Sequence, residues 1–196
     1  MPRIAEDAMD VLFRDARSQN RWLPREVPRE TLRELHDLMK WGPTSANCWP
    51  QRVVFAVTAE AKERLASIAM PGNQDKIRQA PATAILGYDL AFFDRMDVLF
   101  AHNPGMAEMF RNNAELAEVT AFRNATLQGA YFMLAARSLG LDCGPMSGFD
   151  NLKCDELFFA GTTVRSNFLC SIGYGDSEGL FGRLPRPEFE DVCRVE

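Results

Sequence analysis

The chain has 196 residues, of which 46% are hydrophobic and 25% charged, values that are ordinary for a soluble globular protein with a sizeable core. Its formal net charge of −5 argues against a general affinity for nucleic acids or for acidic membrane surfaces. No apolar run approaches the roughly 18 residues that cross a bilayer, and the N-terminal segment mixes Arg, Glu and Asp with its apolar residues, unlike a signal peptide.

The numbers of cysteines and histidines indicate the cellular compartment of the protein and whether a metal site is expected. The 5 cysteines are odd in number and form no C-x-x-C pair, which favours a reducing, cytoplasmic location. The 2 histidines, His36 and His102, argue against a zinc site built on histidine pairs, so we expect no bound metal. Neither an internal repeat nor a linker interrupts the sequence, and we therefore expect a single domain over residues 1–196.

Two amphipathic helices are predicted at the start of the chain. Apolar residues recur at helical spacing from Met9 to Ala16, which predicts a helix over about residues 6–17. A second helix is expected to follow Pro28 and to stop at Trp41-Gly42-Pro43.

Compact apolar runs predict strands at residues 53–58, 82–88 and 168–174. A further short strand is expected to end at the segment Gly144–Gly148. Shorter helical elements are predicted at residues 59–69, 73–79 and 150–159. This mixture of helices and strands indicates an α+β or α/β protein.

The most apolar long segment is residues 119–139, where only Arg123 and Arg137 are charged and Gly140 supplies the terminating glycine. A helix that is apolar nearly all round is buried, so we expect the central core helix here, with a dimer contact as a further possibility. Residues 89–118 combine aromatic clusters, turns and mixed charge, which suits a mobile lid or short surface helices.

Two Gly/Pro/Ser/Asn-rich segments stand out at the ends of apolar elements, residues 41–50 and residues 144–150. Small residues allow backbone N–H groups to approach a ligand closely. Thr44, Ser45 and Asn47 are then either polar ligand contacts or turn and capping residues. With no catalytic triad in view, this pattern suggests a bound cofactor that performs the chemistry.

Asn73 and Lys76 are spaced i, i+3, so both project from one side of a helical turn. An amide beside an ammonium group suits the edge of a heterocyclic ring, although a solvated surface pair is the commoner meaning of such spacing. Cys48 is a weak candidate for a nucleophile in an exposed loop. Gly173-Tyr174-Gly175 imitates a dinucleotide fingerprint, but too few residues follow for the required βαβ unit, and we reject a Rossmann site.

Taken together, these segments resemble the nitroreductase superfamily of FMN-dependent NAD(P)H oxidoreductases, and most closely the subgroup that includes malonic semialdehyde reductase. The resemblance covers nearly the whole chain. Its seven blocks are Ala16-Arg17-Ser18, Lys40 to Asn47, Gly72 to Lys76, Ala121 to Asn124, Gly144 to Asp150, Gly173 to Asp176 and Arg183 to Arg186.

The resemblance implies an α+β, nitroreductase-like fold with a central mixed β-sheet flanked by helices, in an intertwined homodimer whose C-terminal tails embrace the partner. Two FMN sites are expected, each built by both subunits. The resemblance places four residues near the phosphate and ribityl chain of FMN: Arg17, Ser18, Asn20 and Arg183. It places Asn73 and Lys76 at the pyrimidine edge of the flavin, and four residues over the flavin ring: Pro145, Met146, Ser147 and Gly148. It expects four contacts from the other subunit: Pro43, Thr44, Ser45 and Asn47.

Three positions depart from the pattern of that family. Its N-terminal motif carries a second basic residue, a place that falls on Asn20 or Arg21 depending on register. Its lysine two positions before the C-terminal arginine is Phe181 here, which leaves one fewer cation for phosphate. Its Gln-Pro-Trp is replaced by Trp49-Pro50-Gln51.

The implied activity is ping-pong hydride transfer through flavin N5, from NADH or NADPH to a small semialdehyde such as malonic semialdehyde, which gives 3-hydroxypropionate. Because the flavin carries the chemistry, no catalytic side chain is expected. Two alternatives remain: a broad nitro and quinone reductase with the same site, or a flavin-binding module without turnover.

Overall fold

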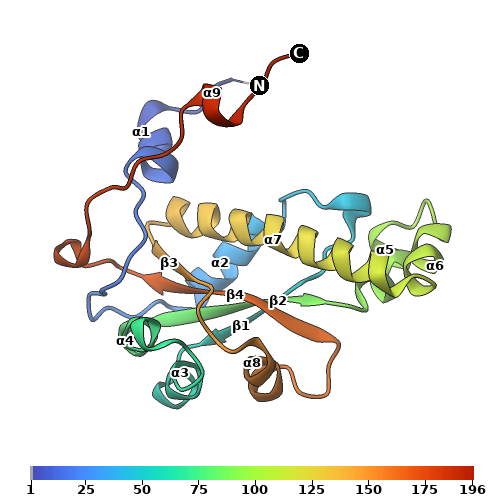
Figure 1. Cartoon of the computed structure of the whole chain (residues 1–196), viewed down its shortest axis with the longest axis horizontal. Helices are drawn as coiled ribbons and strands as arrows, with labels where there is room; N and C mark the ends of the chain where they lie inside the picture. The colour runs from blue at the N-terminus through green and yellow to red at the C-terminus, as the bar shows by residue number, and fades with distance from the viewer. Residues whose placement is uncertain (1) are drawn as a thin grey trace.

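The computed structural model describes residues 2–196 and shows one antiparallel sheet between two helical layers (Figure 1). The sheet order is β1-β2-β4-β3. Its strands are β1 (Gln51–Ala56), β2 (Ala82–Asp89), β3 (Asp142–Met146) and β4 (Val164–Gly173). The α+β class expected from the sequence is confirmed.

Each face of the sheet has its own apolar core. On one face lie α2 (Arg29–Met39) and the long helix α7 (Ala114–Ser138), packed through residues such as Leu35 and Phe132. The other face carries α3 (Ala59–Ala66), α4 (Pro71–Gln79) and α8 (Asn151–Phe158), packed through Leu65, Ile77 and Cys154. Strands with both faces covered read as continuous apolar runs, which is why β2 was predictable.

The sheet differs from the expected mixed one, because every pairing between its named strands is antiparallel. A parallel pairing occurs at the isolated bridge between Ser18 and Cys143, where the N-terminal segment passes the edge of β3. The connections from β1 to β2 and from β3 to β4 each return the chain in the opposite direction. The connection from β2 to β3, which contains α7, places β3 on the far side of β4, so β2 and β3 run in the same direction without pairing.

Pairing also moves two strand boundaries. β1 begins two residues before the expected start, because Gln51 pairs with Tyr88. β4 starts at Val164 rather than at residue 168, since it follows β2 as far as Asp89 through a bulge beside Leu86 and Gly87. The added residues at the start of β1 and β4 are mostly polar, so the hydrophobic pattern of the sequence did not predict them.

The N-terminal helix is shorter than predicted and is not part of the core. It consists of α1 (Glu6–Met9) and a π-helical turn (Asp10–Arg14), and neither contains a buried residue. Phe13, on the apolar face that suggested a core helix, is 52% exposed. Met9, Leu12 and Ala16 on the same face are half-buried, and Arg137 of α7 donates to the carbonyl of Leu12, so the described chain covers this face only in part.

α7 begins at Ala114, five residues before the predicted start, because Asn113 caps it by accepting a hydrogen bond from the N–H of Leu116. Its end is as expected: Gly140 has a φ of 74° and donates to the carbonyl of Arg137. The expectation that the helix is buried all round is wrong within one chain. Phe122 and Leu127 are each 49% exposed on the side away from the sheet core.

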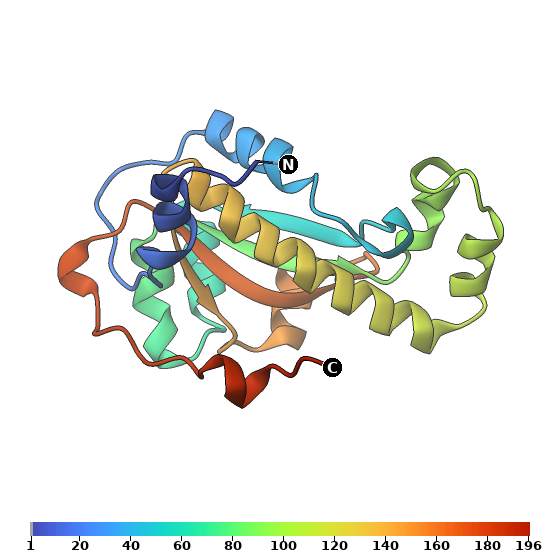
Figure 2. The ribbon, with the colours of Figure 1, turned by 90° about the horizontal axis from the view of Figure 1, so that it is seen from above.

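Residues 89–118 form a 3-10 turn (Phe92–Arg95) and two short helices, α5 (Met96–Leu99) and α6 (Gly105–Arg111). The prediction of short helices is therefore confirmed, and these elements extend beyond the N-terminal end of α7 (Figure 2). Phe92, Phe110 and Met96 bury a small third core against the start of α7. That the segment is a mobile lid stays a prediction.

After Gly175 the chain leaves the sheet and runs along the outside of the molecule (Figure 1). It forms a 3-10 turn (Ser177–Gly179) and the short helix α9 (Phe189–Val192), neither of which contains a buried residue. The expectation that this tail lacks a core of its own is thereby confirmed. Among residues 2–196, no helix is both long and apolar enough to span a membrane.

Candidate functional site

A cavity of about 490 Å³ lies between the N-terminal segment and the C-terminal tail. We call it the arginine pocket, because four arginines line it and no carboxylate does. The four are Arg17, Arg137, Arg183 and Arg186. Ser18 and Asn20 line it as well, so the structure brings together the four residues expected near a phosphate, from opposite ends of the chain.

The arginines of this pocket are held by carbonyl groups. Arg183 donates to the carbonyls of Arg14 and Ala16, at 2.5 and 3.3 Å, and Arg17 donates to the carbonyl of Phe181. Arg137 donates to the carbonyl of Leu12 at 3.0 Å. Carbonyl partners orient a guanidinium without neutralising it, so the pocket keeps its positive charge for an anion.

Sequence reasoning missed Arg137 and Arg186 as members of this pocket. Arg137 sits in the last turn of α7, in a segment whose apolar character pointed only to a core helix. Arg186 stands three residues after Arg183 in the extended tail. Asn20 and Phe181 stand where the family pattern has basic residues. Arg137 and Arg186 line the same pocket and supply two positive charges there.

The arginine pocket is joined to the glycine-rich segment 144–148 through the edge of the sheet. The N–H of Gln19 donates to the carbonyl of Cys143 at 2.9 Å, next to the bridge between Ser18 and Cys143. β3 then leads directly from Cys143 to Ser147. The predicted phosphate residues and the predicted flavin-covering segment are therefore parts of one continuous region.

Asn73, on α4, contacts the same glycine-rich segment 144–148. Its Nδ2 donates to the carbonyl of Gly148 at 3.1 Å, and the N–H of Met70 donates to the same carbonyl at 2.9 Å. A Cβ on Gly148 would lie 2.8 Å from Asn73 Nδ2, so a larger residue here would displace the Asn73 amide from its present position. Lys76 follows one turn later on α4 and is half-buried.

The side chains of residues 145–148 do not all face one way. Pro145 and Ser147 are exposed, while Met146 is 7% exposed and packs in the core beneath α3 and α8. This alternation is the period of a strand. Of the predicted contacts in this segment, Met146 can offer a ligand only its backbone.

The predicted loop residues Pro43, Thr44, Ser45 and Asn47 lie elsewhere in the same chain. Their loop follows α2 and lies beside α5, at the end of the molecule opposite α4 (Figure 1). The structure does not bring them to Asn73 or to the arginine pocket. The resemblance assigned them to the partner's site, and that assignment stays a prediction.

This loop is conformationally costly. Ala46, Asn47 and Trp49 have φ values of 49°, 46° and 46°, in the left-handed region that L-residues other than glycine rarely adopt. Each such residue costs on the order of 1 kcal/mol or more. Side-chain hydrogen bonds hold the loop, among them one from the N–H of Ser45 to Oδ1 of Asn124 at 2.8 Å.

The environment of Cys48 counts against its role as a nucleophile. The side chain is fully buried, and burial raises the pKa of its thiol to about 11. The reactive form of a cysteine is the thiolate, which is scarce at neutral pH with such a pKa. Cys154 is buried as well, and burial raises its pKa to about 12.

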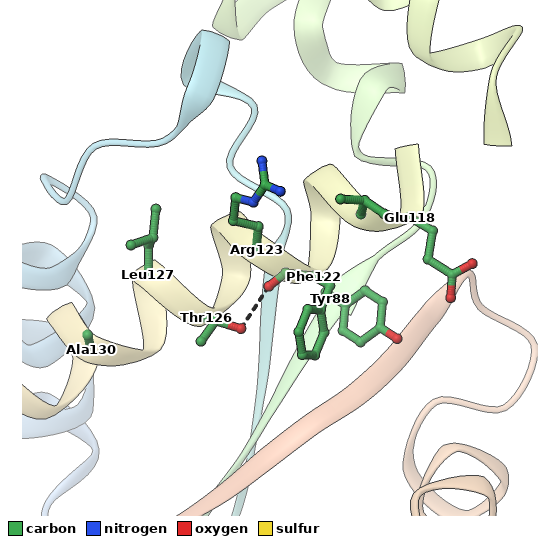
Figure 3. Close-up of a pocket in the computed structure, with 8 residues that line it drawn as sticks. Tyr88, Glu118, Phe122, Arg123, Thr126, Leu127 and Ala130 are labelled. Atoms are coloured by element: carbon green, nitrogen blue, oxygen red, sulfur yellow. Dashed lines mark hydrogen bonds between the residues drawn. The ribbon is translucent and has the colours of Figure 1, made fainter. Parts of the chain in front are cut away.

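A second hollow, of about 860 Å³, runs along the exposed side of α7 (Figure 3). We call it the α7 groove. Phe122 and Tyr88 pack edge to face in it, with their ring centroids 5.6 Å apart, and Leu127 extends it along the helix. Glu118 and Arg123 project from the same stretch of helix. Exposed apolar side chains gathered on one helix face make the α7 groove a candidate interaction surface.

Comparison with known proteins gives one consistent result. Residues 14–175 match the model of the nitroreductase family. A Ralstonia pickettii protein, HadB, is 55% identical over 190 residues, with 96% of this chain and 97% of the relative covered. A Cupriavidus pinatubonensis protein is 53% identical, with the same shares covered. Both are provisionally named NADH dehydrogenase/NAD(P)H nitroreductase.

Solved structures show the same fold. A nitroreductase-type protein of Exiguobacterium sibiricum, solved in complex with FMN, superposes with a TM-score of 0.87 at 19% identity, and the match covers 100% of both chains. At this identity the likeness supports the fold and not the substrate.

Proposed function

The chain belongs to the nitroreductase family, and from that premise we propose that it is an FMN-dependent NAD(P)H oxidoreductase. The observation that carries the proposal is the arginine pocket, where four guanidinium groups without a carboxylate partner surround a cavity of about 490 Å³. Such a donor set suits the phosphate of FMN, which carries close to two negative charges at neutral pH. The names of the relatives and the FMN in the Exiguobacterium structure support it.

The remaining residues suit the rest of the cofactor. Asn73 and Lys76 would face the pyrimidine edge of the ring, since the Asn73 amide already lies against Gly148. Ser147 is exposed at the end of β3 and would present its backbone N–H to the ring. When bound, FMN supplies hydride transfer between NAD(P)H and an oxidising substrate.

The contribution of the protein is then positioning and electrostatics. The arginines hold the phosphate, Lys76 stabilises negative charge at the N1/O2 edge, and the glycine-rich segment leaves room for a ring over the sheet edge. No side chain is required as an acid or nucleophile. The high pKa of Cys48 agrees with that assignment.

We propose a homodimer in which the α7 groove faces a second copy. Phe122 and Leu127 are half-exposed on a helix that the sequence marks as a core helix, and a second copy would bury them. The costly loop with Thr44, Ser45 and Asn47 lies far from Asn73 in the same chain, so a partner's loop is what would complete each site. The tail after Gly175 contains no buried residue in the described chain, and we propose that it wraps around the partner.

Two classes of compound are candidates for the oxidising substrate. The resemblance in sequence favours a small semialdehyde such as malonic semialdehyde, reduced to 3-hydroxypropionate. The names of two relatives that are 55% and 53% identical favour nitro compounds, and the resemblance adds quinones as a further possibility. We also propose a cytoplasmic location, supported by 5 cysteines that are all free thiols.

A visible spectrum of the purified protein tests the cofactor, and extraction identifies it. Bleaching by NADH or NADPH and recolouring by an added substrate test turnover, with malonic semialdehyde, nitrofurazone and menadione as the three acceptors. We expect stoichiometric FMN and recolouring by at least one acceptor. A colourless protein that does not take up added FMN would overturn the proposal, whereas a yellow protein that no acceptor reoxidises would indicate a flavin-binding module.

A further inference from the structure

A buried amide lies beneath the costly loop Thr44–Trp49. Asn124, in the middle of α7, is 2% exposed. Its Nδ2 donates to the carbonyl of Thr120 at 2.8 Å, one turn back on the helix. That bond fixes the orientation of the amide, so Oδ1 faces the loop and accepts the N–H of Ser45 at 2.8 Å.

The other side-chain hydrogen bonds of the loop do not reach the core helix. Thr44 Oγ1 accepts the N–H of Trp49 within the loop, at 3.2 Å. The indole N–H of Trp49 reaches the carbonyl of Lys40 just before the loop, at 3.2 Å. Asn47 Nδ2 donates to the carbonyl of Leu99 in α5, at 2.8 Å. Asn124 thus joins the loop to the long core helix α7.

A loop with three left-handed residues relaxes unless its surroundings determine it, and costly backbone of this kind gathers where a ligand must be met. We infer that Asn124 is a positioning residue, which holds the Thr44–Trp49 loop in the shape that meets the flavin of the partner subunit. The inference rests on the proposed function for the flavin and the partner. The hydrogen bond to Ser45 is independent of both.

Gln128 provides a matched comparison one turn further along α7. It is fully buried, and its Oε1 accepts the N–H of Gln51 at 3.0 Å. Asn124 and Gln128 therefore make the same kind of bond from the same helix to the same stretch of chain. Only Asn124 bonds to the loop, whereas Gln128 bonds to the first residue of β1.

The hydrogen bond between Ser45 and Asn124 can also be removed by a substitution at Ser45, which leaves the buried side chains unchanged. Its side chain is exposed, and it is the first residue of a short 3-10 helix after Thr44, whose φ of −133° and ψ of 154° are compatible with a following proline. Ser45→Pro removes the N–H that Asn124 accepts. Ser45→Ala removes the hydroxyl and keeps that N–H.

The experiment compares the full chain with Asn124→Leu, Ser45→Pro, Ser45→Ala and Gln128→Leu. Hydrogen exchange of the peptide that contains residues 45–49 is measured without FMN, and the FMN dissociation constant is measured by fluorescence. We expect Asn124→Leu and Ser45→Pro each to speed exchange in the loop and to raise the dissociation constant about 10-fold. Ser45→Ala is the reference for loss of the hydroxyl alone, so Ser45→Pro should exchange faster and bind FMN about 10-fold more weakly than Ser45→Ala. Gln128→Leu should stay within about 3-fold of the wild type, and the double variant Asn124→Leu/Ser45→Pro should be no worse than either single change.

Two results would overturn the inference. One is a Ser45→Pro variant with the same exchange and affinity as Ser45→Ala, which remains measurable even if Asn124→Leu does not fold. The other is a Gln128→Leu variant that weakens FMN binding as much as Asn124→Leu, since that would indicate a general loss of stability. A wild-type protein that does not bind FMN would instead overturn the proposed function, while the exchange comparison would still decide whether Asn124 orders the loop.

Discussion

The side-chain amide of Asn73 donates a hydrogen bond to the main-chain carbonyl of Gly148, 3.1 Å away. This contact joins two segments that are 75 residues apart in sequence. It puts the first turns of α4 against the glycine-rich end of β3. The predictions below depend on this region and on the arginine pocket next to it.

Lys76, one turn beyond Asn73, is expected to set the redox potential of the bound flavin. An ammonium group at the N1/O2 edge stabilises reduced flavin, which tends towards an anion, by roughly 1.5–3 kcal/mol more than oxidised flavin. Lys76→Ala should therefore lower the two-electron potential by about 30–65 mV. Lys76→Arg, which keeps the charge, is the control. An unchanged potential in a redox titration of Lys76→Ala removes this residue from the site.

Arg183 is expected to hold the FMN phosphate. A charge-assisted contact is worth roughly 1.5–3 kcal/mol, so Arg183→Ala should raise the FMN dissociation constant about 10- to 150-fold, with a smaller effect on the rate of the loaded enzyme. Since Arg183 also donates to the carbonyls of Arg14 and Ala16, Arg183→Lys separates charge from this structural role. Unchanged affinity in a titration would show that the assignment is wrong.

Arg137, like Arg186, is a residue of the pocket that only the structure revealed. Arg137→Gln removes the charge and keeps a side chain that can donate to the carbonyl of Leu12. We expect FMN affinity to fall about 10-fold and the salt dependence of binding to weaken, because one phosphate-directed cation is lost. Arg33→Gln, on the exposed side of α2, should alter neither quantity. Equal effects of the two variants would contradict a specific role.

Leu127 should be buried between two copies. Leu127→Asp places a charge on the α7 groove, and burying an unpaired charge is costly. Sedimentation should then show monomer at micromolar concentration, with loss of FMN, because in the proposed dimer a loop of the partner completes each site. Leu152→Asp, at a side chain that is 76% exposed on α8, is the matched control and should remain dimeric. A Leu127→Asp dimer with full FMN content would count against this interface.

Cys48 gives a prediction about pH. Burial raises the pKa of its thiol from 9.0 to about 11 in the folded state, so the folded protein holds this proton more tightly than the unfolded chain does. The resulting stabilisation is fully present below pH 9 and is lost as the pH rises towards 11, by up to about 2 kcal/mol. The free energy of unfolding, measured by denaturant titration from pH 8 to 11, should therefore fall less steeply in Cys48→Ala than in the wild type. Equal slopes would show that the thiol is not protected.

Several elements of the fold were predictable from the sequence because their signals are local. The apolar run of β2 and the periodicity of α2 place these elements within a residue or two of where they lie. Gly140 ends α7 as expected, since a left-handed residue at a helix end needs only its own backbone. Four residues of the arginine pocket were found through the resemblance, not through spacing: Arg17, Ser18, Asn20 and Arg183.

What only the tertiary structure decided depends on contacts between distant segments. Arg137 and Arg186 belong to different elements, and no local pattern tells which carbonyl groups or cavities they will meet. The sequence marked α7 as buried because apolar residues surround it, but an apolar pattern does not say whether its cover comes from the same chain. Phe122 and Leu127 are left half-exposed because the sheet occupies one side of the helix and residues 2–196 cover the other side only in part.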